Sequence, residues 1–344
     1  MSTQNINNLV ELFFINYKKQ KKDNILLTSL KDNRNYFTWE KTFHSIKKLS
    51  SEIKKYVNKG DRCLLISENR PEWFITDLSV MLSEAITVPA YTTYAEKDYE
   101  YIIENCNPKL IFVSNQEQFN KVKEIIKKKS FVTKIFSFEQ LDIDSESYIN
   151  VNKLFFNLDY QDLKIPDLSI KRKDPACIIY TSGTQGNPKG VILSHGGILN
   201  NCDGALDILK PLLTDQTRFL TWLPLSHSYE HTVQFVQISV GAKIFYAESI
   251  EKLIKNMNDC KPQLMTAVPR FYQNLFQKIN TSFNKATGLK KKLILKMLEL
   301  GTKKINKQSL TILEKLIDSI LEKIVRKKIK SQFGGELKTF VSGG

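Results

Sequence analysis

The residues best suited to chemistry lie in one polar loop between two apolar runs. From Thr181 to Pro188 every residue is Gly, Pro, an amide or a hydroxyl residue, and Lys189 and Gly190 follow. Glycines let the backbone turn its N–H groups toward an anion, hydroxyls donate further hydrogen bonds, and Lys supplies positive charge. A surface turn between two strands uses some of the same residue types. Three hydroxyls, two glycines and a Pro-Lys-Gly ending together favour a polyphosphate-binding loop.

The flanks of this loop also carry structural signals. Ala176–Tyr180 is rich in β-forming residues and predicts a buried strand, a second apolar run covers Val191–Leu193, and Ser194 stands where a helix would be capped. The loop is not a Walker A motif, because Pro188 precedes and Gly190 follows the Lys where that motif has Gly and then Ser or Thr. It also lacks the Gly-x-Gly-x-x-Gly dinucleotide fingerprint.

A second polar cluster contains His227, Glu230 and His231. Two His and a Glu within five residues could hold a metal, or supply a general base with an orienting carboxylate. In a helix the four-residue spacing would place both His on one face. Ser228 stands where a zinc-binding His-Glu-x-x-His helix has Glu, which argues against that site. The structural alternative is the start of a helix capped by Ser226.

These motifs carry a family resemblance. Tyr180–Gly190 resembles the Tyr-Thr-Ser-Gly-Thr-Thr-Gly-x-Pro-Lys-Gly signature of the adenylate-forming enzymes (acyl-CoA synthetases, luciferases and peptide-synthetase adenylation domains), with Gln185 in place of one Thr. Leu223–His227 is similar to their Leu-Pro-Leu-x-His motif, and Val268–Phe271 resembles the Val-Pro-Arg-Phe of the long-chain branch. Residues 68–74 and 86–93 look like the N-terminal region of bacterial long-chain acyl-CoA synthetases, although alone they indicate only packing and turns.

The resemblance implies an α/β fold. It predicts the large N-terminal domain of the adenylate-forming fold, incomplete and without the C-terminal domain, with two mostly parallel sheets flanked by helices. The expected subdomains are 60–205, a sheet region that ends in the phosphate loop, and 1–59 plus 215–344, which carries the acyl-site segment and basic amphipathic helices.

Local patterns predict the elements independently. Residues 10–56 are expected to be helical apart from a hairpin within 24–38, with Thr38 capping the second helix. The strands expected next are 60–66, 85–89, 109–113 and 131–136. The first intervening helix is expected to be amphipathic and to end at Leu82, and this alternation of strands and helices favours a parallel, doubly wound sheet. Residues 142–170 are expected to be an irregular connection.

The resemblance also implies a reaction. A long-chain fatty-acid carboxylate attacks the α-phosphate of Mg-ATP to give an acyl-adenylate, and the thiol of CoA then displaces AMP. ATP, Mg²⁺ and CoA are therefore the expected cofactors and co-substrate. The residues expected to hold the β- and γ-phosphates are Thr181, Ser182, Gly183, Thr184, Gln185, Gly186 and Lys189. The hydroxyl of Thr181 or Thr184 would be available to Mg²⁺.

Lys189 and His227 are the catalytic candidates that the resemblance provides. His227, and with weaker support Glu230, would lie at the acyl end of the site near the reacting carboxylate. His231 is expected to be structural.

The family's segments for adenine, ribose and CoA, and the catalytic Lys of its C-terminal domain, would follow the Ser342-Gly-Gly at which this chain stops. We therefore expect weak or no catalysis from these residues alone. Two alternatives stay open: a fatty-acyl-AMP ligase that passes its product to a carrier protein, and a non-catalytic peripheral membrane or nucleotide-binding protein.

The composition bears on which kinds of partner and cellular location are expected for the chain. The 344 residues carry a formal charge of +15, but they include only seven Arg and 44 Lys, which favours a Lys-rich composition over a nucleic-acid surface. The five Cys are scattered and predict neither disulfides nor a zinc site. No apolar run of about eighteen residues and no signal-peptide core occur, so a cytoplasmic protein is expected. The oligomeric state stays open.

Charge is concentrated late in the chain. Lys285–Lys330 contains fourteen basic and four acidic residues, with apolar residues at helical spacing. This pattern predicts two basic amphipathic helices broken near Gly301. Such helices suit peripheral binding to an anionic membrane surface at the inner face. Helices that pack on the domain and expose a solvated basic face fit the pattern equally well.

Overall fold

The computed structural model describes residues 3–343 except 32–34, 163, 167, 182–186 and 215. It forms two compact units: Met1–Thr217 with Thr221–Ala247, and Arg218–Leu220 with Glu248–Gly344. The expected subdomains, 60–205 and 1–59 plus 215–344, have other boundaries, and that division stays a prediction.

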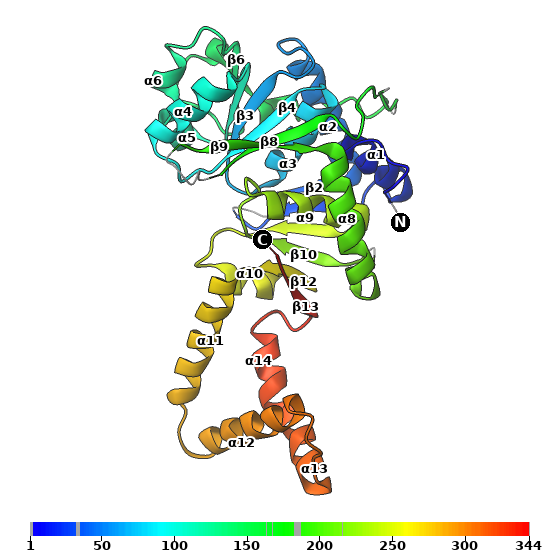
Figure 1. The fold of residues 1–344 in the computed structure, drawn as a ribbon, viewed down its shortest axis with the longest axis vertical. Coiled ribbons are helices and arrows are strands. Elements are labelled where there is room, and N and C mark those ends of the chain that lie inside the picture. The colour runs from blue at the N-terminus through cyan, green and yellow to red at the C-terminus, as the bar shows by residue number, and fades with distance from the viewer. Residues whose placement is uncertain are drawn as a thin grey trace. The chain divides into compact units, whose positions relative to one another are not determined.

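The first unit contains a seven-stranded sheet of order β7-β6-β5-β3-β4-β8-β9. Figure 1 labels β3, β4, β6, β8 and β9 of this sheet. Its strands are β3 (Arg62–Ile66), β4 (Ile86–Ala90), β5 (Leu110–Val113), β6 (Lys134–Ser137), β7 (Tyr148–Asn150), β8 (Pro175–Thr181) and β9 (Lys189–Ser194). All neighbours pair in parallel except β9, which runs antiparallel to β8. The helical segments of this region are α3 (Pro71–Leu82), α4 (Glu96–Cys106), α5 (Gln116–Asn120), α6 (Lys123–Ile126), η2 (Ser145–Ser147), α7 (Val151–Leu154), α8 (His195–Leu209) and η3 (Lys210–Leu212).

The other strands belong to the second sheet. In the first unit, β1 (Ile25–Ser29) pairs in parallel with β11 (Lys243–Tyr246) and antiparallel with β2 (Tyr36–Thr38). In the second unit, β12 (Leu264–Ala267) pairs in parallel with β10 (Arg218–Thr221) and with β13 (Thr339–Ser342). Both sheets are mostly parallel and flanked by helices, so the predicted fold class is confirmed.

Three further helices belong to the first unit. They are α1 (Leu9–Lys19), α2 (Trp39–Ile53) and α9 (Ser228–Ser239). The second unit is mainly helical beyond its strands. Its helices are α10 (Leu253–Cys260), α11 (Pro269–Asn284), α12 (Gly288–Ile305), α13 (Ile312–Leu321), the π-helical turn η4 (Glu322–Arg326) and α14 (Lys327–Ser331).

Three sequence predictions are wrong in informative ways. The helix that ends at Leu82 is not amphipathic: all twelve residues of α3 are buried, because α3 contacts α1 and α2 as well as β1 and β4. The supposed irregular connection at 142–170 is wrong in its first part, which contains β7 paired with β6, whereas the described residues from 155 to 170 form no helix or strand. Gly301 does not break a helix, because α12 continues through it to Ile305, and one Gly inside a helix costs only about 1 kcal/mol.

The hairpin and cap near residue 38 are confirmed. β1 and β2 pair antiparallel, and Thr38 is the N-cap of α2, with its hydroxyl oxygen accepting a 3.1 Å hydrogen bond from the Lys41 backbone N–H. α1 and α2 then pack through aromatic rings: Phe13 stacks on Trp39 at 5.6 Å. The Thr38 cap therefore fixes the start of α2, whose first residue, Trp39, is buried in the core.

A buried ion pair connects two helices of the first unit. His231 of α9 lies 2.8 Å (Nε2 to Oδ2) from Asp77 of α3, and both side chains are fully buried. The Trp73 ring packs edge-on against the imidazole, and Cys177 of β8 lies beside it. Burial alone would lower the pKa of His231, but the Asp77 carboxylate overrides burial and raises that pKa to about 10. His231 is therefore protonated at neutral pH.

Replacing Thr38 with Ala should lower the free energy of unfolding by about 1 kcal/mol, because an orphan N–H at the start of α2 loses its acceptor. Thr38→Ser keeps the oxygen and should lose clearly less. Urea unfolding of the three proteins measures this difference. Equal stability of the Ala and Ser variants would contradict the cap.

Replacing Asp77 with Asn should destabilise the protein by about 3–5 kcal/mol at neutral pH, because it leaves His231 buried without its counter-charge. The folded-state pKa of about 10 lies above the ordinary value of 6.5. The contribution of the pair is therefore complete below about pH 6.5 and is lost as the pH rises toward 10. The deficit of Asp77→Asn in urea unfolding should shrink over that range.

The double variant Asp77→Leu with His231→Leu is the control, since removing both charges should be milder than removing one. A double variant less stable than Asp77→Asn, or a deficit that does not change with pH, would refute an ionised pair.

Candidate functional site

The predicted phosphate loop lies between the two strands of a hairpin. β8 pairs antiparallel with β9, and the last pair of the register is Thr181 with Lys189. Both residues are exposed. Ser182, Gly183, Thr184, Gln185 and Gly186 lie outside the described residues. The structure therefore brings the first and last predicted phosphate contacts together at the mouth of one hairpin.

Two tyrosine hydroxyls form hydrogen bonds at Tyr180, next to the mouth of the hairpin. The Tyr180 hydroxyl donates a 2.5 Å hydrogen bond to the Asn105 side-chain oxygen, and the Tyr94 hydroxyl donates to the Tyr180 carbonyl at 3.4 Å. Gly190 faces Tyr180 across the hairpin, and a Cβ there would lie 3.2 Å from the Tyr180 ring and 3.0 Å from Ile178. The glycine after Lys189 thus allows the Ile178 and Tyr180 side chains to pack closely against the facing strand.

Helix α8 follows the hairpin directly. Ser194 is its N-cap and accepts a 3.1 Å hydrogen bond from the Gly197 N–H, as predicted. His195, the first helical residue, is buried, and its Nδ1 accepts from the Leu9 N–H at 3.3 Å. Burial lowers the pKa of His195 to about 4, so it stays neutral. The chain that leaves the hairpin is therefore held by the cap of α8 and by the contact of His195 with the start of α1.

The second cluster begins helix α9. His227, not Ser226, is the N-cap: its Nδ1 accepts a 3.2 Å hydrogen bond from the Tyr229 N–H. An accepting Nδ1 carries no proton, so the neutral ring has its proton on Nε2. His227 is exposed. Its Nε2–H can therefore donate to an anionic substrate group.

Glu230 and His231 do not join His227 on the surface. Glu230 is buried in the first turn of α9, where the helix dipole favours a carboxylate. His231 belongs to the buried pair with Asp77. Over the described ranges, no three His, Cys, Asp or Glu side chains gather as a metal site. The His-x-x-x-His spacing therefore separates a surface residue from a core residue.

Sequence reasoning missed one positioning contact. The Asn69 amide brackets the segment before His227: its Nδ2 donates to the Leu223 carbonyl at 2.6 Å, and its Oδ1 accepts from the Leu225 N–H at 3.0 Å. More than 150 residues separate the partners. The only available signal was the resemblance of residues 68–74 to the family, which by itself indicated packing.

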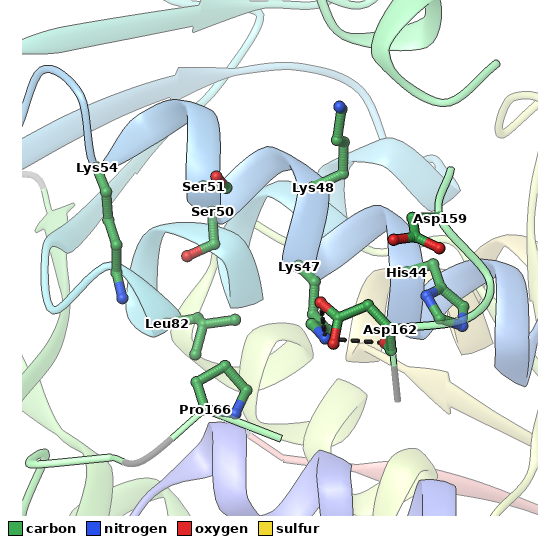
Figure 2. Close-up of a pocket in the computed structure, with 10 residues that line it drawn as sticks. All are labelled: His44, Lys47, Lys48, Ser50, Ser51, Lys54, Leu82, Asp159, Asp162 and Pro166. Carbon is green, nitrogen blue, oxygen red and sulfur yellow. Dashed lines mark hydrogen bonds and ion pairs between the residues drawn. The ribbon is translucent and has the colours of Figure 1, made fainter. Parts of the chain in front are cut away.

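A pocket of about 400 Å³ is lined mainly by α2 and by residues of 159–166, and none of its lining residues belongs to either motif (Figure 2). Lys47 points toward Asp162 and donates to its carboxylate at 2.6 Å and to the Asp162 and Lys164 carbonyls. Lys48 points away from this pair (Figure 2). The inward-facing Lys47 already has its partners within the chain, and we assign no ligand to this pocket.

None of the helices in the described part of the chain is both long and apolar enough to cross a bilayer.

Comparisons with known proteins agree with the motifs. Long chain acyl-CoA synthetase 3 of Arabidopsis thaliana is 29% identical over 321 residues, which cover 89% of this chain and 47% of that protein. Fatty acyl-CoA synthetase A of Dictyostelium discoideum is 27% identical over 306 residues, covering 86% and 44%. The chain thus spans about half the length of the curated relatives it matches.

Among solved structures, ATP-bound MatB from Rhodopseudomonas palustris has the same fold, with a TM-score of 0.68 at 16% identity over 98% of this chain and 55% of that one. The family model described as AMP-binding enzyme matches residues 14–344. With the hairpin and its signature residues in place, the chain belongs to the AMP-binding enzyme family.

Proposed function

We propose that this chain binds Mg-ATP at the β8–β9 loop, and that the protein to which it belongs activates a long-chain fatty acid as its acyl-adenylate, on the way to acyl-CoA. These residues alone are proposed to be weak or inactive in catalysis. The observation that carries the proposal is the hairpin that sets Thr181 opposite Lys189, both exposed, at the ends of a loop with the family's signature. The names of the relatives, long-chain and fatty acyl-CoA synthetases, support the acyl substrate.

The chemistry of this step is mainly charge neutralisation. A carboxylate must approach a phosphate, so two anions have to be held together. Lys189 would place its ammonium against the β- and γ-phosphates, beside the loop N–H groups and hydroxyls. His227 would donate its Nε2–H to the fatty-acid carboxylate and align it for attack on the α-phosphate.

Magnesium fits the donor set, because hydroxyl and phosphate oxygens are the ligands it prefers. The exposed Thr181 hydroxyl, or that of Thr184, would complete the coordination begun by the ATP phosphates. A bound Mg²⁺ would supply further positive charge to the phosphates. Transfer of the acyl group to CoA is proposed for the protein to which these residues belong, since the chain spans about half of its relatives.

Replacing Lys189 with Met should weaken Mg-ATP binding by about tenfold or more, the loss expected for one charge-assisted contact to phosphate. Isothermal titration of this chain with Mg-ATP measures the affinity. Lys128→Met, an exposed lysine that follows α6, is the matched control and should bind as the parent does. If Lys189→Met binds Mg-ATP as tightly as the parent, the β8–β9 loop is not the phosphate-binding site.

Replacing His227 with Asn keeps an N-cap acceptor for α9 but removes the imidazole, so stability should hold while activity falls. We expect fatty-acid-dependent ATP–pyrophosphate exchange to drop about tenfold to a hundredfold, with Mg-ATP affinity unchanged, in a chain that continues in frame past Gly344. His227→Ala should lose both activity and about 1 kcal/mol of stability. Full exchange activity in His227→Asn would exclude the proposed role.

A further inference from the structure

Helices α13 and α14 and the turn η4 present one solvent face that combines apolar and basic side chains. We call it the apolar-basic face; its residues are Ile312, Leu313, Leu316, Ile320, Lys323, Ile324 and Lys327. The five apolar members are 90, 67, 61, 47 and 55% exposed, in chain order. Their spacing of three and four residues places them on one side of the helix. Large exposed side chains gathered on one side indicate an interaction surface.

The opposite side of α13 is already packed. Leu321 is buried in a cluster with Met297 and Leu300 of α12, and Ile317 and Val325 pack against that cluster. The apolar-basic face is therefore not the side that folds the unit. A helix that is apolar on both sides is suited to contacts on both.

All four acidic residues of the segment 285–330 form ion pairs with basic residues of the same segment. Glu299 pairs with Lys296 and Lys303, and Glu314 with Lys303 at 2.5 Å. Asp318 pairs with Lys304 and Arg326, and Glu322 with Arg326. Glu314 and Asp318 are mostly buried.

The surface charge of the segment is therefore one-sided. Of the fourteen basic residues in 285–330, the ion pairs use four, and the remaining ten lysines have no ion pair among the residues that the structure describes. Exposed Lys323 and Lys327 belong to the same helical stretch as the exposed Ile320 and Ile324.

A cavity next to the apolar-basic face is also lined by both apolar and basic side chains. This cavity of about 340 Å³ between α11, α12 and η4–α14 has mostly apolar walls and includes Ile324 of the apolar-basic face. Lys290 and Lys328 line it as well. Apolar walls with lysines nearby suit an acyl chain that carries an anionic head group.

We propose that the apolar-basic face docks on an anionic lipid bilayer. A bilayer offers both complements at once, hydrocarbon for the Ile and Leu side chains and anionic head groups for the lysines. Nucleic acid would match the charge but leave the exposed aliphatic side chains without a partner. The surface does not depend on the proposed enzyme activity, and Lys189→Met should leave it intact.

The test is co-sedimentation of the full chain with vesicles of equimolar phosphatidylcholine and phosphatidylglycerol, and with vesicles of phosphatidylcholine alone. We expect binding to the anionic vesicles, little binding to the neutral ones, and weakening as salt is raised. Lys323→Glu with Lys327→Glu should weaken binding by more than about tenfold, since each basic residue near the surface contributes roughly fivefold. Leu313→Gln with Leu316→Gln should weaken it while retaining the salt dependence.

Matched controls come from the first unit. Lys97→Glu with Lys128→Glu reverses two exposed lysines there, and Ile208→Gln replaces an exposed residue of α8. Both should bind vesicles as the parent does. Circular dichroism melting verifies that every variant is folded, which the exposure of the changed side chains predicts.

Three outcomes would overturn the proposal. The first is equal binding by the face variants and the parent. The second is an equal loss in the first-unit charge controls, which would mean that binding follows net charge alone. The third is self-association abolished by the face variants with no vesicle binding by the parent, since the face would then join two copies of the chain.

Discussion

The first unit depends on one electrostatic constraint, the contact between the buried Asp77 carboxylate and the buried His231 imidazolium. Two opposite charges removed from water are tolerated only when each satisfies the other, so α3 and α9 have to meet at this point. Cys177 of β8 lies against the same imidazole. The contact thereby connects β8, which leads into the predicted phosphate loop, with α9, whose N-cap is His227. The two candidate motifs of the site are thus held by a common core, to which the second motif contributes His231 itself.

The four histidines show how environment decides the role of one residue type. Burial lowers the pKa of His44 and of His195, and these rings serve as neutral packing groups. His231 is equally buried but has a carboxylate beside it, so its pKa moves the other way. His227 is exposed and caps a helix through Nδ1, which leaves the Nε2 side of the ring toward solvent. The chain order of His227 and His231 suggested a common face, and the start of α9 between them places one in water and the other in the core.

Features set by neighbouring residues could be predicted from the sequence. Thr38 and Ser194 cap helices because a hydroxyl next to a helix start reaches the orphan N–H groups of its own first turn. The strands around Leu64 and Ile111 follow from apolar runs with helices between them. Features that depend on distant partners could not be predicted. Asn69 gains its role only when Leu223 is brought to it, and α3 is buried on all sides only because α1 and α2 cover it. The polar loop itself was recognised by its residue types, whereas its setting as a hairpin required the pairing of β8 with β9.

The excess of lysine has one meaning for the chain as a whole and another for its helical segment. Over the whole chain, abundant Lys and scarce Arg indicate a compositional preference, and lysines such as Lys47 are neutralised by partners within the fold. In 285–330 the same composition has a different consequence, because Glu314 and Asp318 face inward and draw Lys303, Lys304 and Arg326 with them. Among the described residues of this segment, the charges left without an ion pair are lysines, and exposed Leu and Ile side chains accompany them. Counting charges along the sequence cannot separate these cases, since the distinction is which charges the fold has already paired. Packing on one side of α13 therefore creates the one-sided charge on its other side.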